Sequence, residues 1–258
     1  MITAKAFAGK HYAVYGLARS GLATVEALLA SGARVTAWDA NEAARENAVD
    51  AVMQLSHDLD EVQLVIADLD IADLTLFDSL VVTPGLPLNR HPIAARARAA
   101  KLEIIGDIEL FARARPELPP HKVVGITGTN GKSTTTALVH HILAGAGVPS
   151  LMGGNIGLPI LSQEPLPEGG VYVLELSSYQ IDLTQSLDCD VAVLLNIAPD
   201  HLDRYGSFDA YAASKARLFK MQSPGHVAAV MCDDSSTRAL YEDLANYRSH
   251  DLLSWPTA

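Results

Sequence analysis

The chain has 258 residues, of which 49% are apolar and 19% are charged, and its formal net charge is -11 at pH 7. This length suits two α/β domains, and the apolar fraction is sufficient for a core in each. Because the charge is negative and the sequence shows no basic cluster, we expect neither nucleic acid nor an anionic membrane surface as a partner.

Cysteine usage suits a reducing compartment, and hydropathy shows no signal peptide or membrane span. Cys189 and Cys232 lie far apart and form neither a CxxC motif nor a Cys/His cluster, so we expect no disulfide framework and no structural zinc. The first residues lack the apolar stretch of a signal peptide, and no later run approaches the length of a membrane span. We therefore expect a cytoplasmic protein without a membrane partner, and a monomer.

Short apolar runs alternate with Ala-rich amphipathic segments over about the first hundred residues. This alternation predicts a parallel sheet with helices on both faces, an α/β fold. The predicted strands are HYAVYG, RVTAWD, LVIAD, LVVTP and LEIIG, with the helix GLATVEALLASGA after the first. The segment FARARPELPPHK, residues 111–122, carries three prolines. We place a domain boundary there, between a Rossmann-like domain (residues 1–115) and a second domain (residues 121–258).

A second strand and helix alternation follows the boundary. Its predicted strands are KVVGIT, VYVLEL, DVAVLLN and HVAAVM, and its predicted helices are STTTALVHHILAGAG and FDAYAASKARLFKM. The same logic predicts a second parallel sheet, here with a phosphate-binding loop between the first strand and the first helix.

The segment YGLARSGLA is a weak dinucleotide-type motif. Gly16 and Gly21 occupy the outer positions of G-x-G-x-x-G, but Ala18 stands in the middle. Such glycines allow a tight turn whose free N–H groups can hold an anion, and Asp39, which ends the next strand, lies where a ribose-binding acid is expected. Alternatively, the glycines only shape a turn and Asp39 caps the next element. The TPG turn at residues 83–85 reaches the same sheet edge, and Ala18 disfavours a redox dinucleotide.

The loop TGTNGKST departs from the pattern G-x-x-x-x-G-K-[ST], because Ile126 stands where the first glycine is required. It keeps what a phosphate needs. Gly128 and Gly131 let the backbone curl, Lys132 supplies a cation, and Ser133 can bind magnesium at a helix N-terminus. A hairpin turn is the alternative, but the residues after Ser133 have helical spacing.

Polar side chains follow two further strands of the second domain. Glu175 ends the run VLEL, and a carboxylate beside a phosphate loop is the expected second anchor for magnesium; a structural salt bridge is the alternative. The run LLN is followed by Asn196, Asp200, His201 and Asp203, and His201 could serve the site or stand exposed in a helix cap. Lys215 shares a predicted helix face with Tyr211 and Leu218, so it either snorkels or faces the site.

Several segments together closely resemble the Mur ligases of peptidoglycan synthesis, and within them the branch that adds D-glutamate. The segments are GLARSGLA, GDIELF, GITGTNGKSTTTALV, GGNIG, LELSSYQ and NIAPDHLDRYGSFDAYAASKARLF, in family order from about Tyr15 to Phe219. TGTNGKST is the usual form of this loop in the family, which accounts for the displaced glycine.

The resemblance implies an ATP-dependent amide ligase that uses two Mg²⁺ ions. ATP would phosphorylate the carboxylate of UDP-N-acetylmuramoyl-L-alanine, and the amine of D-glutamate would attack the resulting acyl phosphate. Phosphorylation supplies a good leaving group, and the metal ions shield the converging negative charges.

Site residues carry over from the family motif by motif. Lys132 would stabilise the transferred phosphoryl group, and Ser133 and Glu175 would hold one Mg²⁺. His201 would bind the second Mg²⁺ with Lys215, which matches the position that is carbamylated in the family. The triphosphate would be held by Gly128, Thr129, Asn130, Gly131, Lys132, Ser133 and Thr134. The muramoyl group would contact Asn155, Ser177 and Gln180, and the UDP end would contact Leu17, Ala18, Arg19, Ser20, Asp39, Thr83, Pro84 and Gly85.

Three departures from the family stand out. Met231, in MCDD after the last predicted strand, stands where family members often have Asn. GLARSG replaces the frequent GLGxSG. Family members also continue through an ATP-binding motif resembling HNxxN into a third domain, and neither follows here. We therefore expect an incomplete second domain, and a chain that alone binds the UDP substrate, binds ATP weakly and ligates poorly or not at all.

Three alternatives stay open. The chain could be another member of the same ATPase family, such as a different Mur ligase or a folylpolyglutamate-type synthase, which GDIELF and the compact N-terminal domain disfavour. It could be a UDP-sugar-binding module without catalysis. It could be a nicotinamide oxidoreductase, but that leaves the phosphate loop unexplained.

Overall fold

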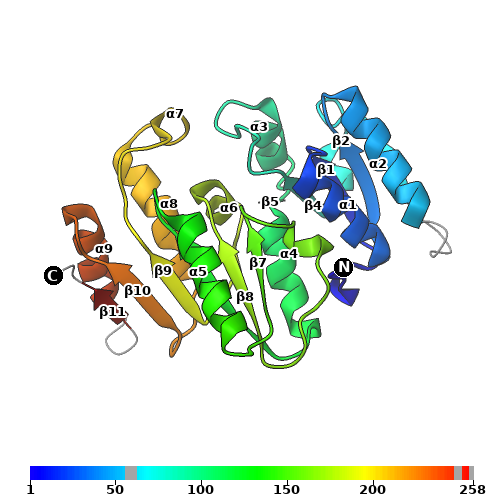
Figure 1. The fold of residues 1–258 in the computed structure, drawn as a ribbon. Helices are drawn as coiled ribbons and strands as arrows, with labels where there is room; N and C mark the ends of the chain where they lie inside the picture. Colours follow the sequence, from blue (N-terminus) through cyan, green and yellow to red (C-terminus); the bar gives the residue numbers. More distant parts are fainter. Residues whose placement is uncertain (56–62, 247–251, 256–258) are drawn as a thin grey trace. The chain divides into compact units, whose positions relative to one another are not determined.

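The computed structural model describes residues 1–55, 63–246 and 252–255. It divides into two compact units. The first comprises Met1–Glu117 and Pro159–Pro165, and the second comprises Leu118–Leu158 and Leu166–Ala258. Each unit is built on a parallel β-sheet flanked by helices (Figure 1), which confirms the predicted α/β fold class.

The sheet of the first unit has the order β3-β2-β1-β4-β5. The chain goes from β1 to one side and later returns to the other side at β4, which creates a switch point between the ends of these two strands, where ligands bind in open parallel sheets. The five predicted strands are all present. Their bounds are β1 His11–Tyr15, β2 Arg34–Trp38, β3 Leu64–Ile66, β4 Ser79–Val82 and β5 Ile104–Ile105. The helices are η1 Lys5–Phe7, α1 Arg19–Ala30, α2 Glu42–Leu55, η3 Leu74–Leu76, α3 Pro92–Ala99, α4 Asp107–Ala114 and η4 Arg115–Glu117.

Close packing explains the glycines after β1. A Cβ atom on Gly21 would lie 1.8 Å from the carbonyl oxygen of Gly16, and a Cβ on Gly16 would lie 2.4 Å from the hydroxyl of Thr83. The start of α1, the β1 turn and the end of β4 therefore approach to distances that only glycine permits. This spacing needs no ligand to account for it.

A short segment of the first unit follows β7 of the second unit in sequence. Its helix η5, Ile160–Ser162, packs on α1 and α4 with Ile160 and Leu161 buried. The Ile2 N–H donates to the Leu161 carbonyl at 2.9 Å. The chain thus returns once to the first unit after the second sheet has begun, a feature with no signal in the apolar periodicity.

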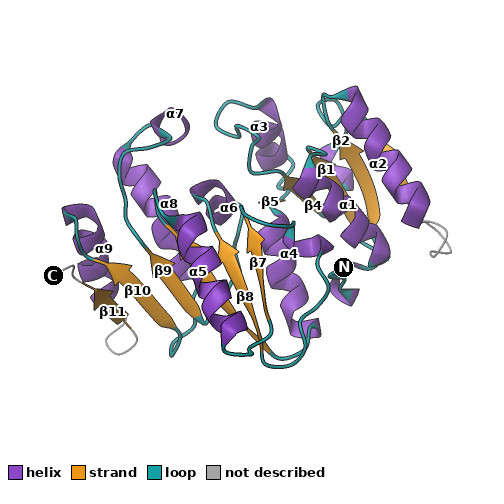
Figure 2. Ribbon diagram, viewed as in Figure 1, coloured by secondary structure: helices purple, strands orange, loops and turns teal. Residues whose placement is uncertain are grey.

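The sheet of the second unit has the order β11-β10-β9-β6-β8-β7. In Figure 2, α5 lies on the near face of this sheet and α8 lies behind it. The strands are β6 His121–Thr127, β7 Ser150–Gly154, β8 Gly170–Glu175, β9 Val191–Leu194, β10 Val227–Met231 and β11 Leu252–Trp255. The helices are α5 Lys132–Gly145, α6 Ser178–Asp182, α7 Leu202–Tyr205, α8 Phe208–Lys220 and α9 Ser235–Ala245. The edge strands β7 and β11 were not predicted, because SLMGG and LLSW are short and carry weak alternation.

Helix α5 is present as predicted, but its apolar residues are not all in the core. Leu138 is 53% exposed and Ile142 is 59% exposed, whereas Thr136 is fully buried. Apolar spacing therefore indicates the type of element here, but it does not show which of its residues are buried. None of the described helices combines the length and apolar character needed to cross a bilayer.

Helix α4 begins with a buried carboxyl group. Asp107 is 5% exposed, and its Oδ1 accepts a hydrogen bond from the Ile108 N–H at 3.0 Å. Burial raises the pKa of Asp107 from 3.8 to about 6, although the Ile108 N–H favours the ionised form. The group lines a small cavity together with Ser20, Thr24 and Thr83.

Replacement of Asp107 by Asn should change how stability depends on pH. The pKa of Asp107 is higher in the folded state, so the folded chain binds more protons between about pH 4 and pH 6 and loses stability as pH rises through that window. A shift of about 2 units corresponds to roughly 2–3 kcal/mol. Thermal unfolding should show Asp107→Asn gaining that much relative to the parent between pH 4 and pH 7.5.

Asp73→Asn is the matched control. Asp73 accepts hydrogen bonds from the Thr75 hydroxyl and N–H, which lower its pKa, so the folded carboxylate contributes stability that is lost as pH falls. The control should shift in the opposite direction. A pH-independent difference between Asp107→Asn and the parent would show that burial does not perturb this carboxyl.

Candidate functional site

The candidate site lies at the carboxyl edge of the second sheet, where the loop of residues 128–131 joins β6 to α5. Gly131 is the N-cap of α5 with φ of +81°, a left-handed conformation that favours glycine. Lys132, Ser133 and Thr134 form the first turn of α5, whose N–H groups lack partners within the helix. The N-terminus of such a helix attracts phosphate through these donors and the helix dipole.

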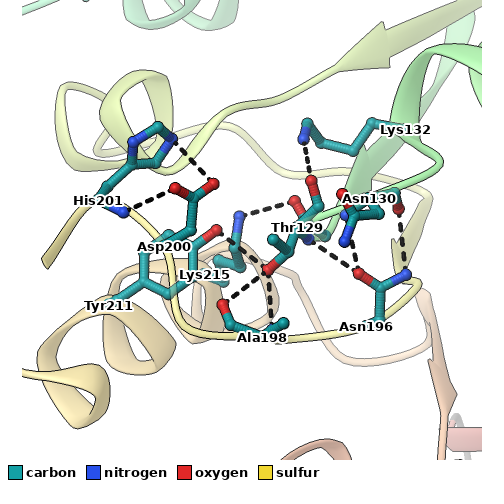
Figure 3. Close-up of polar contacts among 10 residues, drawn as sticks. Thr129, Asn130, Lys132, Asn196, Ala198, Asp200, His201, Tyr211 and Lys215 are labelled. Atoms are coloured by element: carbon teal, nitrogen blue, oxygen red, sulfur yellow. Dashed lines mark hydrogen bonds and ion pairs between the residues drawn. The ribbon is translucent and has the colours of Figure 1, made fainter.

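Asn196 holds the first half of this loop. Its Oδ1 accepts from the N–H groups of Thr129 at 3.2 Å and Asn130 at 2.8 Å, and its Nδ2 donates to the Asn130 carbonyl at 3.1 Å (Figure 3). These two N–H groups are therefore committed to loop shape, and the first turn of α5 is the better anion donor. Sequence reasoning named Asn196 only as a polar residue after β9. Its place at the end of a predicted strand was the available signal, whereas the position of that strand beside β6 comes from the tertiary structure.

The Thr129 side chain adds a second attachment. Its Oγ1 accepts from the Ala198 N–H at 3.0 Å and donates to the Ala198 carbonyl at 3.2 Å. The Lys132 Nζ donates to the Thr129 carbonyl at 2.9 Å, which keeps the cation at the loop. The predicted loop residues are thus gathered in one place, held by the segment that follows β9.

Glu175 ends β8, opposite Ile126 of β6 and Gly154 of β7. The carboxyl is 2% exposed, and its Oε1 accepts from the Asn155 Nδ2 at 3.0 Å. Its Oε2 is buried and has no hydrogen-bond partner among the residues that the structure describes. A buried carboxylate oxygen without a partner is costly, and a cation is the chemistry that would satisfy it. Glu175 and Asn155, two predicted site residues, therefore lie together.

Lys215 lies on the apolar face of α8 and is 1% exposed. Its Nζ donates to the Gly128 carbonyl at 2.9 Å and sits 4.7 Å from the centre of the Tyr211 ring. The amine ends on the phosphate loop, not in solvent, so the side chain does not snorkel. Burial, with a smaller contribution from the charge of Lys132, lowers the pKa of Lys215 to about 7.

His201 is the N-cap of α7 and has a left-handed φ of +52°. Its Nε2 lies 3.4 Å from the Asp200 carboxylate, and its ring centre lies 4.9 Å from that of Tyr179 and 6.1 Å from that of Tyr211. The side chain is 43% exposed. His201 thus occupies a cap and also neighbours the phosphate loop through Tyr211, so its role as a ligand stays a prediction.

Ser177 and Gln180 form a capping box at the start of α6. The Ser177 hydroxyl accepts from the Gln180 N–H, and the Gln180 side chain accepts from the Ser177 N–H at 3.1 Å. Gln180 is 4% exposed. Both side chains therefore have a structural role at this helix, and their contact with a muramoyl group stays a prediction.

In the first unit, the Asp39 carboxylate accepts from the Leu17 N–H at 2.7 Å and from the Asn41 N–H at 2.9 Å. The predicted UDP residues Leu17 and Asp39 thus meet, and the Asp39 carboxylate joins the backbone after the glycine turn to that of Asn41. Contact of Asp39 with a ribose stays a prediction. Ala18 is the N-cap of α1, followed by Arg19 and Ser20. The Leu86 N–H donates to the Thr83 carbonyl at 3.0 Å, closing a turn over Pro84 and Gly85.

The fold and this arrangement define a class. In the second unit, the first strand of a parallel sheet leads through a glycine loop into a helix that begins with a lysine, and the neighbouring strand ends in a buried carboxylate. This is the architecture of a phosphate-loop domain. The other unit is a Rossmann-like sheet with a glycine turn at its switch point.

Comparison with known proteins narrows this class to a family. "Mur ligase middle domain" matches residues 126–254, and "Mur ligase MurD-like, N-terminal domain" matches residues 10–106. The chain belongs to the Mur ligase family.

The relatives found are D-glutamate ligases by name. The chain is 65% identical to the UDP-N-acetylmuramoylalanine--D-glutamate ligase of Sphingopyxis alaskensis, covering 99% of this chain and 58% of the relative. It is also 65% identical to the enzyme of that name from Novosphingobium aromaticivorans, covering 100% of this chain and 58% of the relative. The chain thus spans little more than half the length of these relatives.

Solved structures share the fold at low identity. The UDP-N-acetylmuramate:L-alanyl-gamma-D-glutamyl-meso-diaminopimelate ligase of Neisseria meningitides matches with a TM-score of 0.59 and 17% identity, covering 96% of this chain and 77% of that chain. MurF from Acinetobacter baumannii matches with a TM-score of 0.51 and 22% identity, covering 96% of this chain and 45% of that chain.

Replacement of Asn196 by Ala should loosen the phosphate loop. The change removes the acceptor shared by two loop N–H groups and one donor to the loop, a loss of about 1–3 kcal/mol. Amide hydrogen exchange measured by NMR should accelerate at Asn130 while the amides of β10 stay protected. Thr129 should change less, because its N–H also donates to the Asn196 backbone carbonyl at 3.0 Å. Asn196→Asp keeps the acceptor and loses the donor, so its exchange rate at the loop should lie between those of Asn196→Ala and the parent. Unchanged exchange in Asn196→Ala would contradict the role of Asn196 in holding the loop.

Proposed function

We propose that this chain supplies the UDP-substrate and ATP-binding parts of a cytoplasmic ligase that joins D-glutamate to UDP-N-acetylmuramoyl-L-alanine in peptidoglycan precursor synthesis, a process tied to cell shape and division. The observation that carries the proposal is the 65% identity to two D-glutamate ligases over 99–100% of this chain. The phosphate loop and the buried carboxylate beside it supply the chemistry that such a reaction needs.

The proposed reaction has two steps. A carboxylate oxygen of the UDP substrate attacks the γ-phosphorus of ATP, forming an acyl phosphate and releasing ADP. The amine of D-glutamate then attacks the acyl carbon, the phosphate leaves with the bonding electrons, and the amine loses a proton to solvent. The first turn of α5 would bind the β- and γ-phosphates, and Lys132 would stabilise negative charge on the transferred group.

The residues present fit a divalent cation. Glu175 offers a buried oxygen without a partner among the described residues, and Ser133 lies in the first turn of α5. Mg²⁺ would neutralise charge on the phosphates. His201 and Lys215 are proposed for a second ion. The described residues contain no group of three or more His, Cys, Asp and Glu side chains able to hold a metal. A modified Lys215 would supply further oxygen ligands for the second ion.

Carbamylation of Lys215 would complete this site. The neutral amine adds to CO₂, forming a nitrogen to carbon bond, and a proton passes to solvent. The product is an anion with two oxygen ligands that keeps one N–H for the Gly128 carbonyl. A buried amine already placed on the phosphate loop is the geometric support for this proposal.

Nucleotide binding should depend on Lys132. In calorimetric titrations with Mg²⁺ and a non-hydrolysable ATP analogue, Lys132→Ala should lose at least about tenfold in affinity, because a charge-assisted contact of about 1.5–3 kcal/mol is removed. Lys220→Ala, the same change at an exposed position of α8, should leave affinity unchanged.

The UDP substrate provides the second arm of the same experiment. UDP-N-acetylmuramoyl-L-alanine should bind the parent and Lys132→Ala alike. Failure of the parent to bind this substrate, with nucleotide bound, would leave a phosphate-loop ATPase and remove the muramoyl assignment. Equal nucleotide affinity in the parent and Lys132→Ala would remove the phosphate-loop assignment.

The Lys215 proposal has its own readout. Chain equilibrated with ¹³C-bicarbonate should show a carbamate resonance in the ¹³C NMR spectrum at pH 8. The resonance should be absent from Lys215→Gln and retained in Lys220→Gln. A resonance that persists in Lys215→Gln would place the modification elsewhere.

A further inference from the structure

Tyr211 has no role in the function proposed above, yet it lies at the centre of the site. It is 1% exposed and lies on α8 one helical turn before Lys215. Residues four apart share a helix face, so both side chains point from α8 toward the phosphate loop (Figure 3).

These two side chains hold consecutive loop residues. The Lys215 Nζ donates to the Gly128 carbonyl, and the Tyr211 hydroxyl lies 3.2 Å from the Thr129 Oγ1. The Thr129 hydroxyl lies 3.2 Å from both the Ala198 carbonyl and the Tyr211 hydroxyl, and either hydroxyl of the Thr129–Tyr211 pair can be the donor.

The ring of Tyr211 makes the remaining contacts. Its face lies 4.7 Å from the Lys215 Nζ. Its centre lies 6.1 Å from that of the His201 imidazole, with the two planes at 78°. One side chain therefore touches the phosphate loop by its hydroxyl, and the two proposed ligands of the second metal ion by its ring.

We propose that Tyr211 is a positioning residue that fixes the phosphate loop relative to Lys215 and His201. Its hydroxyl sets the loop through Thr129, and its ring sets the Lys215 amine and the His201 imidazole. The loop needs such support because Gly128 and Gly131 leave its backbone free to rearrange. This inference rests on the proposed nucleotide site, and Tyr211 acts on it without touching the nucleotide.

Tyr205 provides a matched control in the same aromatic group. Its hydroxyl donates to the Asp182 Oδ2 at 2.7 Å, and its ring centre lies 5.4 Å from that of Tyr211. Tyr211→Phe and Tyr205→Phe each delete one hydrogen-bonded hydroxyl and keep the ring. Only Tyr211→Phe deletes a bond to the loop.

The test compares the two variants with the parent. Titration with Mg²⁺ and a non-hydrolysable ATP analogue should show about a fivefold loss of affinity in Tyr211→Phe, as expected for one lost hydrogen bond, and no loss in Tyr205→Phe. Amide exchange at residues 128–130 should accelerate only in Tyr211→Phe. Both variants should melt at similar temperatures, which separates positioning from a general loss of stability.

Two results would overturn the inference: equal nucleotide affinity in Tyr211→Phe and the parent, or equal loop exchange in the two variants. Absence of nucleotide binding by the parent would instead remove the nucleotide-binding part of the proposed function, and the exchange comparison would still decide whether Tyr211 holds the loop. Tyr211→Leu also lacks the ring, so it should lose more nucleotide affinity and show faster loop exchange than Tyr211→Phe. If Tyr211→Leu does not fold, the result for Tyr211→Phe decides.

Discussion

The candidate site depends on the attachment of a glycine-containing loop to the segment that follows β9. Glycines permit the curl around a phosphate but give the loop no rigidity of its own. Asn196 and Ala198 provide that rigidity through hydrogen bonds to Thr129 and Asn130. This arrangement requires β9 to be the direct neighbour of β6, which the sheet order provides.

Because β8 and β9 both pair in parallel with β6, the residues at their carboxyl ends lie beside the phosphate loop. Glu175 pairs with Ile126 on one side of β6, and Leu194 pairs with Thr127 on the other. Neighbouring strands lie about 4.8 Å apart, so the residues just beyond these pairs meet at one sheet edge. Strand pairing alone thus brings the Glu175 carboxylate, the phosphate loop and the Asn196 amide to the same sheet edge.

Helix α8 packs near this edge, and its buried face, which is otherwise mainly apolar, carries two polar groups. Lys215 and Tyr211 are both 1% exposed, and burying a cation and a hydroxyl is costly unless each has a partner. Their partners are backbone and side chain of the phosphate loop. The conformation of the phosphate loop and the packing of α8 therefore depend on each other: the loop supplies the partners of the buried Lys215 and Tyr211, and these two side chains hold the loop.

The sequence by itself determined the two parallel sheets, the strands β1 to β6 and β8 to β10, and the residues of the phosphate loop, because strong apolar runs and glycine turns are local signals. It also indicated that Lys215 breaks an apolar stripe. Only the tertiary structure decided that η5 returns to the first unit, that Leu138 and Ile142 face outward, and that Asn196 and Tyr211 hold the loop. These outcomes depend on which strands and helices become neighbours across 60 or more residues, and local periodicity carries no information about partners so distant in the chain.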